Sequence, residues 1–167
     1  MEQKKPYRRL IIHDLAPDAI APDPQTDVAA DNGQIHPCVG CYGCWIKTPG
    51  QCVLRDRWEH MGWRIAQCSE LVLITQCLYG GPSPFVKNVL DRSIPYLHPD
   101  FARVNGQMHH VQRYPEQRRL RVRFYGDVTG EEQALARRWV NAIAVNMNLL
   151  TEDVAFSAEP PKGGVLL

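Results

Sequence analysis

The sequence contains no long apolar run. Its 167 residues hold only short stretches such as Leu71 to Ile74, whereas a helix that crosses a membrane needs about 20 apolar residues. Near the N-terminus only Leu10 to Ile12 follows the basic residues, and this run is too short for the core of a signal peptide. We therefore expect no membrane segment and no export, and we place the protein in the cytoplasm.

An excess of charge of one sign is also missing. The 19 basic and 18 acidic side chains give a formal net charge of +1, so a general surface for nucleic acid or acidic lipid is not indicated. Internal repeats and low-complexity blocks do not occur, and the length suits one ordinary domain. We expect residues 1–167 to form this single domain, with residues 159–167 as a mobile tail.

Glycine-rich phosphate-binding loops of two common kinds are absent as well. The 12 glycines of the chain form neither the G-x-x-x-x-G-K-[ST] pattern nor the G-x-G-x-x-G pattern. The sequence therefore gives no sign of a phosphate site of either kind.

What the sequence does contain is a cluster of cysteines. Four of its six cysteines follow the spacing C-x2-C-x2-C-x7-C, and without an export signal they are expected to be reduced. Three interpretations remain open: ligands of an iron–sulfur cluster, a zinc site or redox dithiol, or buried thiols that pack as small apolar groups. The candidate ligands are Cys38, Cys41, Cys44 and Cys52, whereas Cys68 and Cys77 are expected to be core thiols.

Strands and helices are expected to alternate along the chain, which favours a parallel sheet with helices packed on it. The proline-rich residues 16–34 predict no long helix, and residues 97–118 are expected to be irregular. Short apolar runs predict strands at residues 9–13, 71–75, 120–125 and 154–156.

Capping patterns and apolar spacing predict the helices. Asp56 with Glu59, and Thr129 with Glu132, resemble capping boxes. Ser83 followed by Pro84 is typical of a helix start. The predicted helices run from Asp56 to Cys68, from Ser83 to Ile94, and from Thr129 to Met147.

The predicted strand at residues 119–124 differs from the others. Arg119, Arg121 and Arg123 alternate with apolar residues, whereas a central strand of a parallel sheet is apolar on both faces. One explanation is an edge strand in solvent. The other is a sheet with one face thinly covered by its own chain and completed by a second subunit, since residues 16–34 lack the helix that would cover part of that face.

A glycine turn follows the predicted strand at residues 71–75. The turn leads from the carboxyl end of that strand into a helix, and ligands of open parallel sheets bind outside the carboxyl ends of strands. Gly80 and Gly81 permit a close approach of backbone to a flat ligand, and Tyr79 could stack on it. The alternative is an ordinary turn in which these residues only shape the chain.

Two segments together resemble a known family. They are Cys38-Val-Gly-Cys41-Tyr-Gly-Cys44-Trp45 with the nearby Thr48-Pro49-Gly50-Gln51-Cys52, and Tyr79-Gly-Gly-Pro-Ser83-Pro-Phe-Val-Lys87-Asn-Val-Leu-Asp91-Arg92. Both are similar to the NADPH-dependent FMN reductase-like branch of the flavodoxin-like superfamily, which includes the iron–sulfur flavoproteins. The match is specific over residues 36–97 and compatible in layout elsewhere.

This resemblance implies a three-layer α/β sandwich around a parallel five-stranded sheet of order 2-1-3-4-5, here with the first helix shortened or missing. It implies FMN at the strand carboxyl ends, NAD(P)H as electron donor, and a homodimer or homotetramer. The implied cofactor-binding residues are Cys77, Leu78, Tyr79, Gly80, Gly81, Pro82 and Ser83 around the isoalloxazine, with Gly126 in the loop after the fourth strand.

One segment departs from the family pattern. After the first strand the family has a loop rich in Gly, Ser, Arg and Thr that holds the FMN phosphate, but here the chain reads His13-Asp14-Leu15-Ala16-Pro17-Asp18. The two aspartates would repel a phosphate, and Pro17 has no N–H to donate. Either FMN is held differently, by arginines of residues 103–123 or of a partner subunit, or tight flavin binding has been lost.

The first functional hypothesis is thus an FMN-dependent NAD(P)H oxidoreductase that passes electrons to a small-molecule acceptor, with no side chain named as catalytic acid or base. A second is an electron-transfer iron–sulfur flavoprotein whose four clustered cysteines bind a [4Fe–4S] cluster. A third is a flavodoxin-like domain that has lost tight FMN binding and serves in assembly or ligand sensing.

Overall fold

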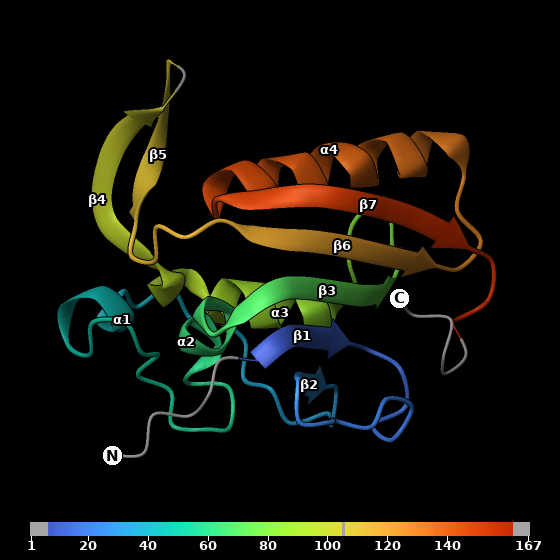
Figure 1. The fold of residues 1–167 in the computed structure, drawn as a ribbon, viewed down its shortest axis with the longest axis horizontal. Coiled ribbons are helices and arrows are strands. Elements are labelled where there is room, and N and C mark those ends of the chain that lie inside the picture. Colours follow the sequence, from blue (N-terminus) through green and yellow to red (C-terminus); the bar gives the residue numbers. More distant parts are fainter. Residues whose placement is uncertain (1–6, 105, 162–167) are drawn as a thin grey trace.

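Five parallel strands form the central sheet of the protein (Figure 1). The computed structural model describes residues 7–104 and 106–161, so the tail expected at residues 159–167 lies mostly outside the described residues. The spatial order is β2-β1-β3-β6-β7, which is 2-1-3-4-5 when these strands are counted along the chain, as expected. The strands are β1 (Tyr7–His13), β2 (Thr26–Ala30), β3 (Cys68–Gln76), β6 (Arg118–Tyr125) and β7 (Leu149–Ser157).

Apolar residues in matching register build the core on one face of the sheet. Leu10 of β1 lies beside Leu71 of β3, which lies beside Leu120 of β6, and all three side chains are fully buried. All the longer helices pack on this face, because each contributes buried residues to the same core. They are α2 (Met61–Ala66), α3 (Pro84–Arg92) and α4 (Gly130–Asn146).

Two of the predicted helix starts are confirmed. The Ser83 hydroxyl accepts a hydrogen bond from the Val86 N–H at the start of α3, with Pro84 in the first turn. The Thr129 side chain and Glu132 cap each other's backbone at the start of α4. These caps fix where both helices leave the carboxyl ends of the strands that precede them.

The opposite face of the sheet has little cover. Residues 14–25, between β1 and β2, form turns and no helix, so the expectation of a shortened or missing first helix is confirmed. A small apolar cluster on this face joins strand residues to Leu15 and Ile20 of that loop. The edge-strand explanation of the alternating arginines is wrong, because β6 lies between β3 and β7. On this face the Glu70 carboxylate lies 2.8 Å from Arg9 and 2.7 Å from Arg121.

The prediction that a helix starts at Asp56 is wrong. Helix α2 begins at Met61, and its N-cap residue, His60, donates or accepts no side-chain capping bond. The Asp56 carboxylate accepts a bond from the Trp58 N–H, but it also binds Arg92 from α3 and is thus held away from a helix start. Cys68 opens β3 rather than ending the helix.

The prediction that residues 97–118 are irregular is wrong. They contain an antiparallel hairpin of β4 (Leu97–Val104) and β5 (Gln107–Gln112), which stands out from the body of the molecule in Figure 1. The rings of Phe101 and His110 stack across the two strands, with centroids 4.4 Å apart. This cross-strand pair stabilises the hairpin, of whose strand residues only Leu97 is buried.

Among the described residues, no helix combines the length and the apolar character that a membrane crossing requires.

Candidate functional site

The segment between β3 and α3 forms a tight turn that we call the ring loop, residues 77–83. Leu78 and Gly81 exchange two backbone hydrogen bonds of 2.9 Å. Tyr79 and Gly80, at the tip, both adopt positive φ angles, of 51° and 76°. The side chain of Tyr79 is 88% exposed, so the loop presents an aromatic ring to solvent.

Anchors at both ends hold the ring loop in place. The Cys77 N–H donates to the Tyr125 carbonyl at 2.9 Å, and the Ser83 N–H donates to the buried Thr75 hydroxyl at 2.8 Å. Gly80 lies against Leu135 of α4 so closely that an added Cβ would come within 2.8 Å of that side chain. The exposed tip of the loop therefore stands on a rigid base.

Gly126, predicted to lie near this loop, does so. It directly follows β6, has a φ angle of 118°, and donates its N–H to the Ser157 carbonyl at 3.0 Å. A Cβ at Gly126 would be 4.0 Å from the Cys77 carbonyl oxygen. The predicted cofactor-binding residues 77–83 and Gly126 are thus brought together at the carboxyl ends of β3 and β6. Cys77, expected to be a core thiol, is buried there.

Asp14 ties the carboxyl end of β1 to this region. Its Oδ2 accepts a hydrogen bond from the Gln76 N–H at 2.9 Å and lies 3.1 Å from the Thr75 hydroxyl. Its Oδ1 accepts a hydrogen bond from the Tyr125 hydroxyl at 3.0 Å. Burial and the neighbouring Asp14 carboxylate raise the pKa of Tyr125, so this phenol remains a donor. The sequence marked Asp14 only as a residue that would repel phosphate.

His13, for which the sequence suggested no role, lies beside Asp14. Its side chain is completely buried, and within the described part of the chain neither ring nitrogen has a hydrogen-bond partner. Burial lowers the pKa of His13 against the opposing effect of Asp14. His13 is therefore neutral at pH 7 and does not balance the charge of the carboxylate.

Only the ring half of FMN fits this end of the sheet, and the phosphate half does not. The ring loop offers an exposed aromatic side chain and close backbone for the isoalloxazine. The phosphate half lacks what an anion needs: residues 14–18 form no helix N-terminus, and Asp14 makes no ion pair with a described basic side chain. Because a carboxylate stands where donors are expected, the phosphate of FMN does not fit here.

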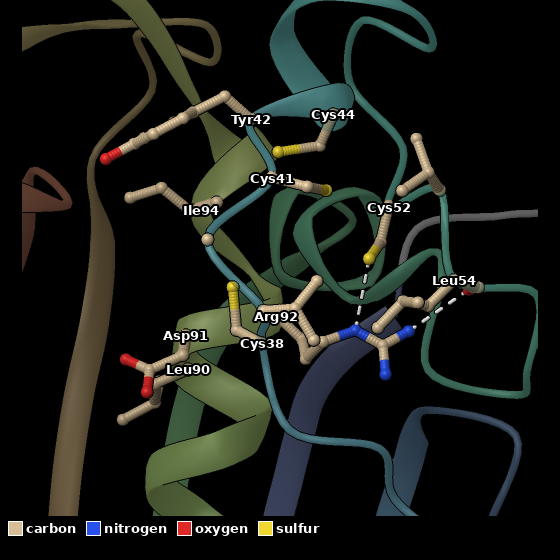
Figure 2. A pocket seen from close by; sticks show the side chains of 13 residues that line it. Cys38, Cys41, Tyr42, Cys44, Cys52, Leu54, Leu90, Asp91, Arg92 and Ile94 are labelled. Atoms are coloured by element: carbon tan, nitrogen blue, oxygen red, sulfur yellow. Dashed lines mark hydrogen bonds between the residues drawn. The ribbon is translucent and has the colours of Figure 1, made fainter.

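The cysteine cluster forms a second candidate site. The four cysteines predicted as ligands line one cavity of about 340 Å³, and Figure 2 shows their sulfur atoms around a common space. Cys38 and Cys41 are exposed, whereas Cys44 and Cys52 are buried. The four cysteines therefore share one cavity, and the choice between the three interpretations stays a prediction.

Arg92, at the end of α3, fixes one wall of this cavity. Its Nε donates to the Cys52 sulfur at 3.1 Å, and its two terminal nitrogens bind the Asp56 carboxylate at 2.8 and 2.9 Å. The same guanidinium donates to the carbonyls of His36 and Leu54. The Arg92 side chain has no exposed surface, so one buried cation holds several parts of the cysteine-bearing loop.

The protonation of the thiols bears on metal binding. Burial, followed by the nearby Cys52, raises the pKa of Cys44 to about 11, so this thiol keeps its proton at pH 7 unless a metal displaces it. In the parts of the chain that the structure describes, no three His, Cys, Asp or Glu side chains are already arranged around a single ion. The four thiols provide the donor set of an iron–sulfur cluster, but the cavity is not preformed for one ion.

The two candidate sites lie at opposite ends of the sheet. Ser83 caps the start of α3 beside the ring loop, and Arg92 ends the same helix beside the cysteines. Nine helical residues at about 1.5 Å each separate these points by about 13 Å. In Figure 1, α1 (Gly43–Ile46), which carries Cys44, lies away from the strand tips.

Comparisons with known proteins support the assignment of the fold. No protein-family model matches the sequence, and no curated protein matches it. The solved structure of an FMN-dependent NADH-azoreductase from Bacillus anthracis, in complex with FMN, matches with a TM-score of 0.56 and 10% identity over 90% of this chain and 86% of that one.

Two further solved structures support the same fold. An NADPH-quinone reductase from P. pentosaceus matches with a TM-score of 0.55 and 13% identity, over 90% of this chain and 84% of that one. An NAD(P)H:quinone oxidoreductase from Methanothermobacter marburgensis matches with a TM-score of 0.54 and 11% identity, over 93% and 86%. At such identities the likeness establishes the flavodoxin-like fold.

Proposed function

We propose that this protein is a flavin-dependent NAD(P)H oxidoreductase of the cytoplasm that passes electrons to a small-molecule acceptor. The observation that carries the proposal is the ring loop, with Gly126 beside it, at the carboxyl ends of a flavodoxin-like sheet. Open parallel sheets bind their ligands at this edge. The similar azoreductase structure contains FMN, and the similar reductases are described as acting with NADPH or NAD(P)H.

The residues of the chain would position a flavin ring. A bound flavin would supply the hydride and electron chemistry, and the protein would supply orientation and exclusion of water. The exposed Tyr79 ring offers a flat apolar surface on one side. The paired backbone bonds of Leu78 and Gly81 hold the backbone that carries this ring, so little backbone entropy is lost on binding.

Replacing Tyr79 with alanine is expected to weaken flavin binding about tenfold, since an aromatic stacking contact contributes up to about 1.5 kcal/mol. Fluorescence titration with riboflavin and FMN measures the effect. Tyr42→Ala is the matched control, because Tyr42 is 61% exposed but lines the cysteine cavity. Equal affinities of the Tyr79 variant and the unchanged protein contradict the role of the ring loop.

If neither flavin binds the unchanged protein, the oxidoreductase proposal is wrong. The third hypothesis, a flavodoxin-like domain without tight flavin binding, then stands in its place. The specific observation that favours this alternative is the Asp14 carboxylate at the end of β1.

The cavity lined by four cysteines favours a second candidate function, electron transfer through a [4Fe–4S] cluster held by Cys38, Cys41, Cys44 and Cys52. Protein purified without oxygen is then expected to contain iron and acid-labile sulfide in equal amounts, close to four of each per chain for a complete cluster. Cys52→Ser is expected to lower both contents, while Cys68→Ser, at a buried thiol outside the cavity, leaves them unchanged. Iron-free anaerobic protein contradicts this candidate.

A homodimer or homotetramer is a further part of the proposal. The thinly covered face of the sheet supports it, as does the hairpin, whose Phe101, Val104 and Met108 are largely exposed. Exposed apolar side chains gathered on a protruding element are typical of subunit contacts.

A further inference from the structure

We infer that the site at the strand carboxyl ends selects a flavin without a phosphate group, such as riboflavin, over FMN, and that Asp14 sets this selectivity. The inference rests on the proposed function, because it names the class of flavin that the ring loop would accept. It is carried by the geometry of Asp14 and by the charges around it.

Asp14 lies where the carboxyl ends of β1 and β3 meet. In a sheet of this strand order, the chain leaves β1 and β3 in different directions, and the crevice between their carboxyl ends is where a ligand and its phosphate bind. Asp14 is the first residue after β1, and it bonds to Gln76 at the end of β3. The carboxylate therefore lies between the carboxyl ends of β1 and β3, where this rule places the ligand.

The hydrogen-bond donors beside Asp14 are already in use. An anion site needs N–H and O–H groups that point toward the ligand. Here the Gln76 N–H and the Tyr125 hydroxyl both donate to Asp14. The protein's own carboxylate thus uses the hydrogen bonds that a phosphate would need.

The charge around Asp14 is negative. Among the described residues Asp14 has no ion-pair partner, and His13 beside it is neutral because burial lowers its pKa. Asp18, exposed in the same loop, adds negative charge. A phosphate group brought to this point would meet an unbalanced like charge at short range.

A phosphate-free flavin avoids this repulsion. Its ribityl chain carries neutral hydroxyls, which can donate to a carboxylate as well as accept. The Asp14 carboxylate has two oxygens with about four lone-pair positions, so it can accept a further hydrogen bond from such a hydroxyl. The same residue that rejects FMN would then bind the uncharged flavin.

Titration of the full chain with riboflavin and with FMN, each followed by flavin fluorescence, tests the inference. The unchanged protein is expected to bind riboflavin about tenfold or more tightly than FMN. Asp14→Asn, which keeps the shape and one acceptor, is expected to raise the affinity for FMN about tenfold and to lower that for riboflavin, because one acceptor for a ribityl hydroxyl is lost. Asp18→Asn removes an equal charge from an exposed position and is expected to have a much smaller effect.

Salt dependence gives a second measurement on the unchanged protein, so the inference can be tested even if Asp14→Asn does not fold. Because salt screens repulsion between like charges, the affinity for FMN should rise relative to riboflavin between low and high ionic strength. Tighter binding of FMN than of riboflavin overturns the inference but leaves the flavin proposal intact, and so does an Asp14→Asn variant that shifts both flavins equally. Failure of both flavins to bind overturns the proposed function and this inference together.

Discussion

Replacement of Arg92 by methionine is expected to lower the free energy of unfolding by about 3–5 kcal/mol, the usual result of removing one partner from a buried ion pair. The Arg92 side chain is fully buried and binds the Asp56 carboxylate through two hydrogen bonds. Without it, Asp56, the Cys52 sulfur and the carbonyls of His36 and Leu54 each lose a donor. Urea denaturation followed by circular dichroism measures the change.

An exposed pair on the same helix gives the matched control. Lys87 binds Asp91 one turn along α3, and both side chains are about half exposed. Lys87→Met is expected to change stability by less than about 1 kcal/mol, since exposed ion pairs contribute little. A loss below about 1 kcal/mol for Arg92→Met would mean that Asp56 and the cysteine loop are held by other contacts.

The second large effect is expected at the tip of the ring loop. Gly80→Ala should cost about 2–4 kcal/mol, because a φ angle of 76° is strained for alanine and the new Cβ would come within 2.8 Å of Leu135. The displaced turn should also weaken riboflavin binding at least about tenfold. Thermal or urea unfolding and flavin titration measure the two effects separately.

The neighbouring glycine is the control for this substitution. A Cβ on Gly81 would meet only the Leu78 carbonyl oxygen, at the ordinary distance of 3.6 Å. We therefore expect Gly81→Ala to cost less than about 1 kcal/mol of folding stability. If both variants behave alike, the contact between the ring loop and α4 does not define the shape of the loop.

Local signals in the sequence predicted part of this structure well. The caps at Ser83 and Thr129 depend on residues within one helical turn, so they can be recognised without knowledge of the fold. The alternating arginines of β6 correctly indicated a polar face, because side chains of a strand alternate between its two faces. The expectation that Cys68 and Cys77 are core thiols is also confirmed, since both are buried in the main core.

Contacts between distant residues account for two of the errors. Asp56 looks like a helix cap, but Arg92, 36 residues away, uses its carboxylate. The sequence at residues 26–30 predicted no strand, because its few apolar residues become a strand only through pairing with β1. The hairpin of β4 and β5 did have a local signal, since Asn105-Gly106 is a favoured hairpin turn sequence.

The candidate site was predicted in outline but not in its bonding. Residues 77–83 and Gly126 lie together because parallel strands end at the same edge of the sheet. That Asp14 accepts bonds from Gln76 and Tyr125 could not be predicted, because those partners are 62 and 111 positions away in sequence. The sequence predicted a repelling charge there but not a structural link.

Asp14 bonds the strand ends together and, in the proposed selectivity, also rejects a phosphate group. This double role limits how the protein can evolve. The carboxylate joins the ends of β1, β3 and β6 on the face that the missing first helix leaves with little cover. A descendant that regained a phosphate loop would have to give up these bonds before the new donors were in place. If Asp14 sets the ligand preference as proposed, one residue contributes to both ligand choice and folding stability, and a change of cofactor would require several substitutions together.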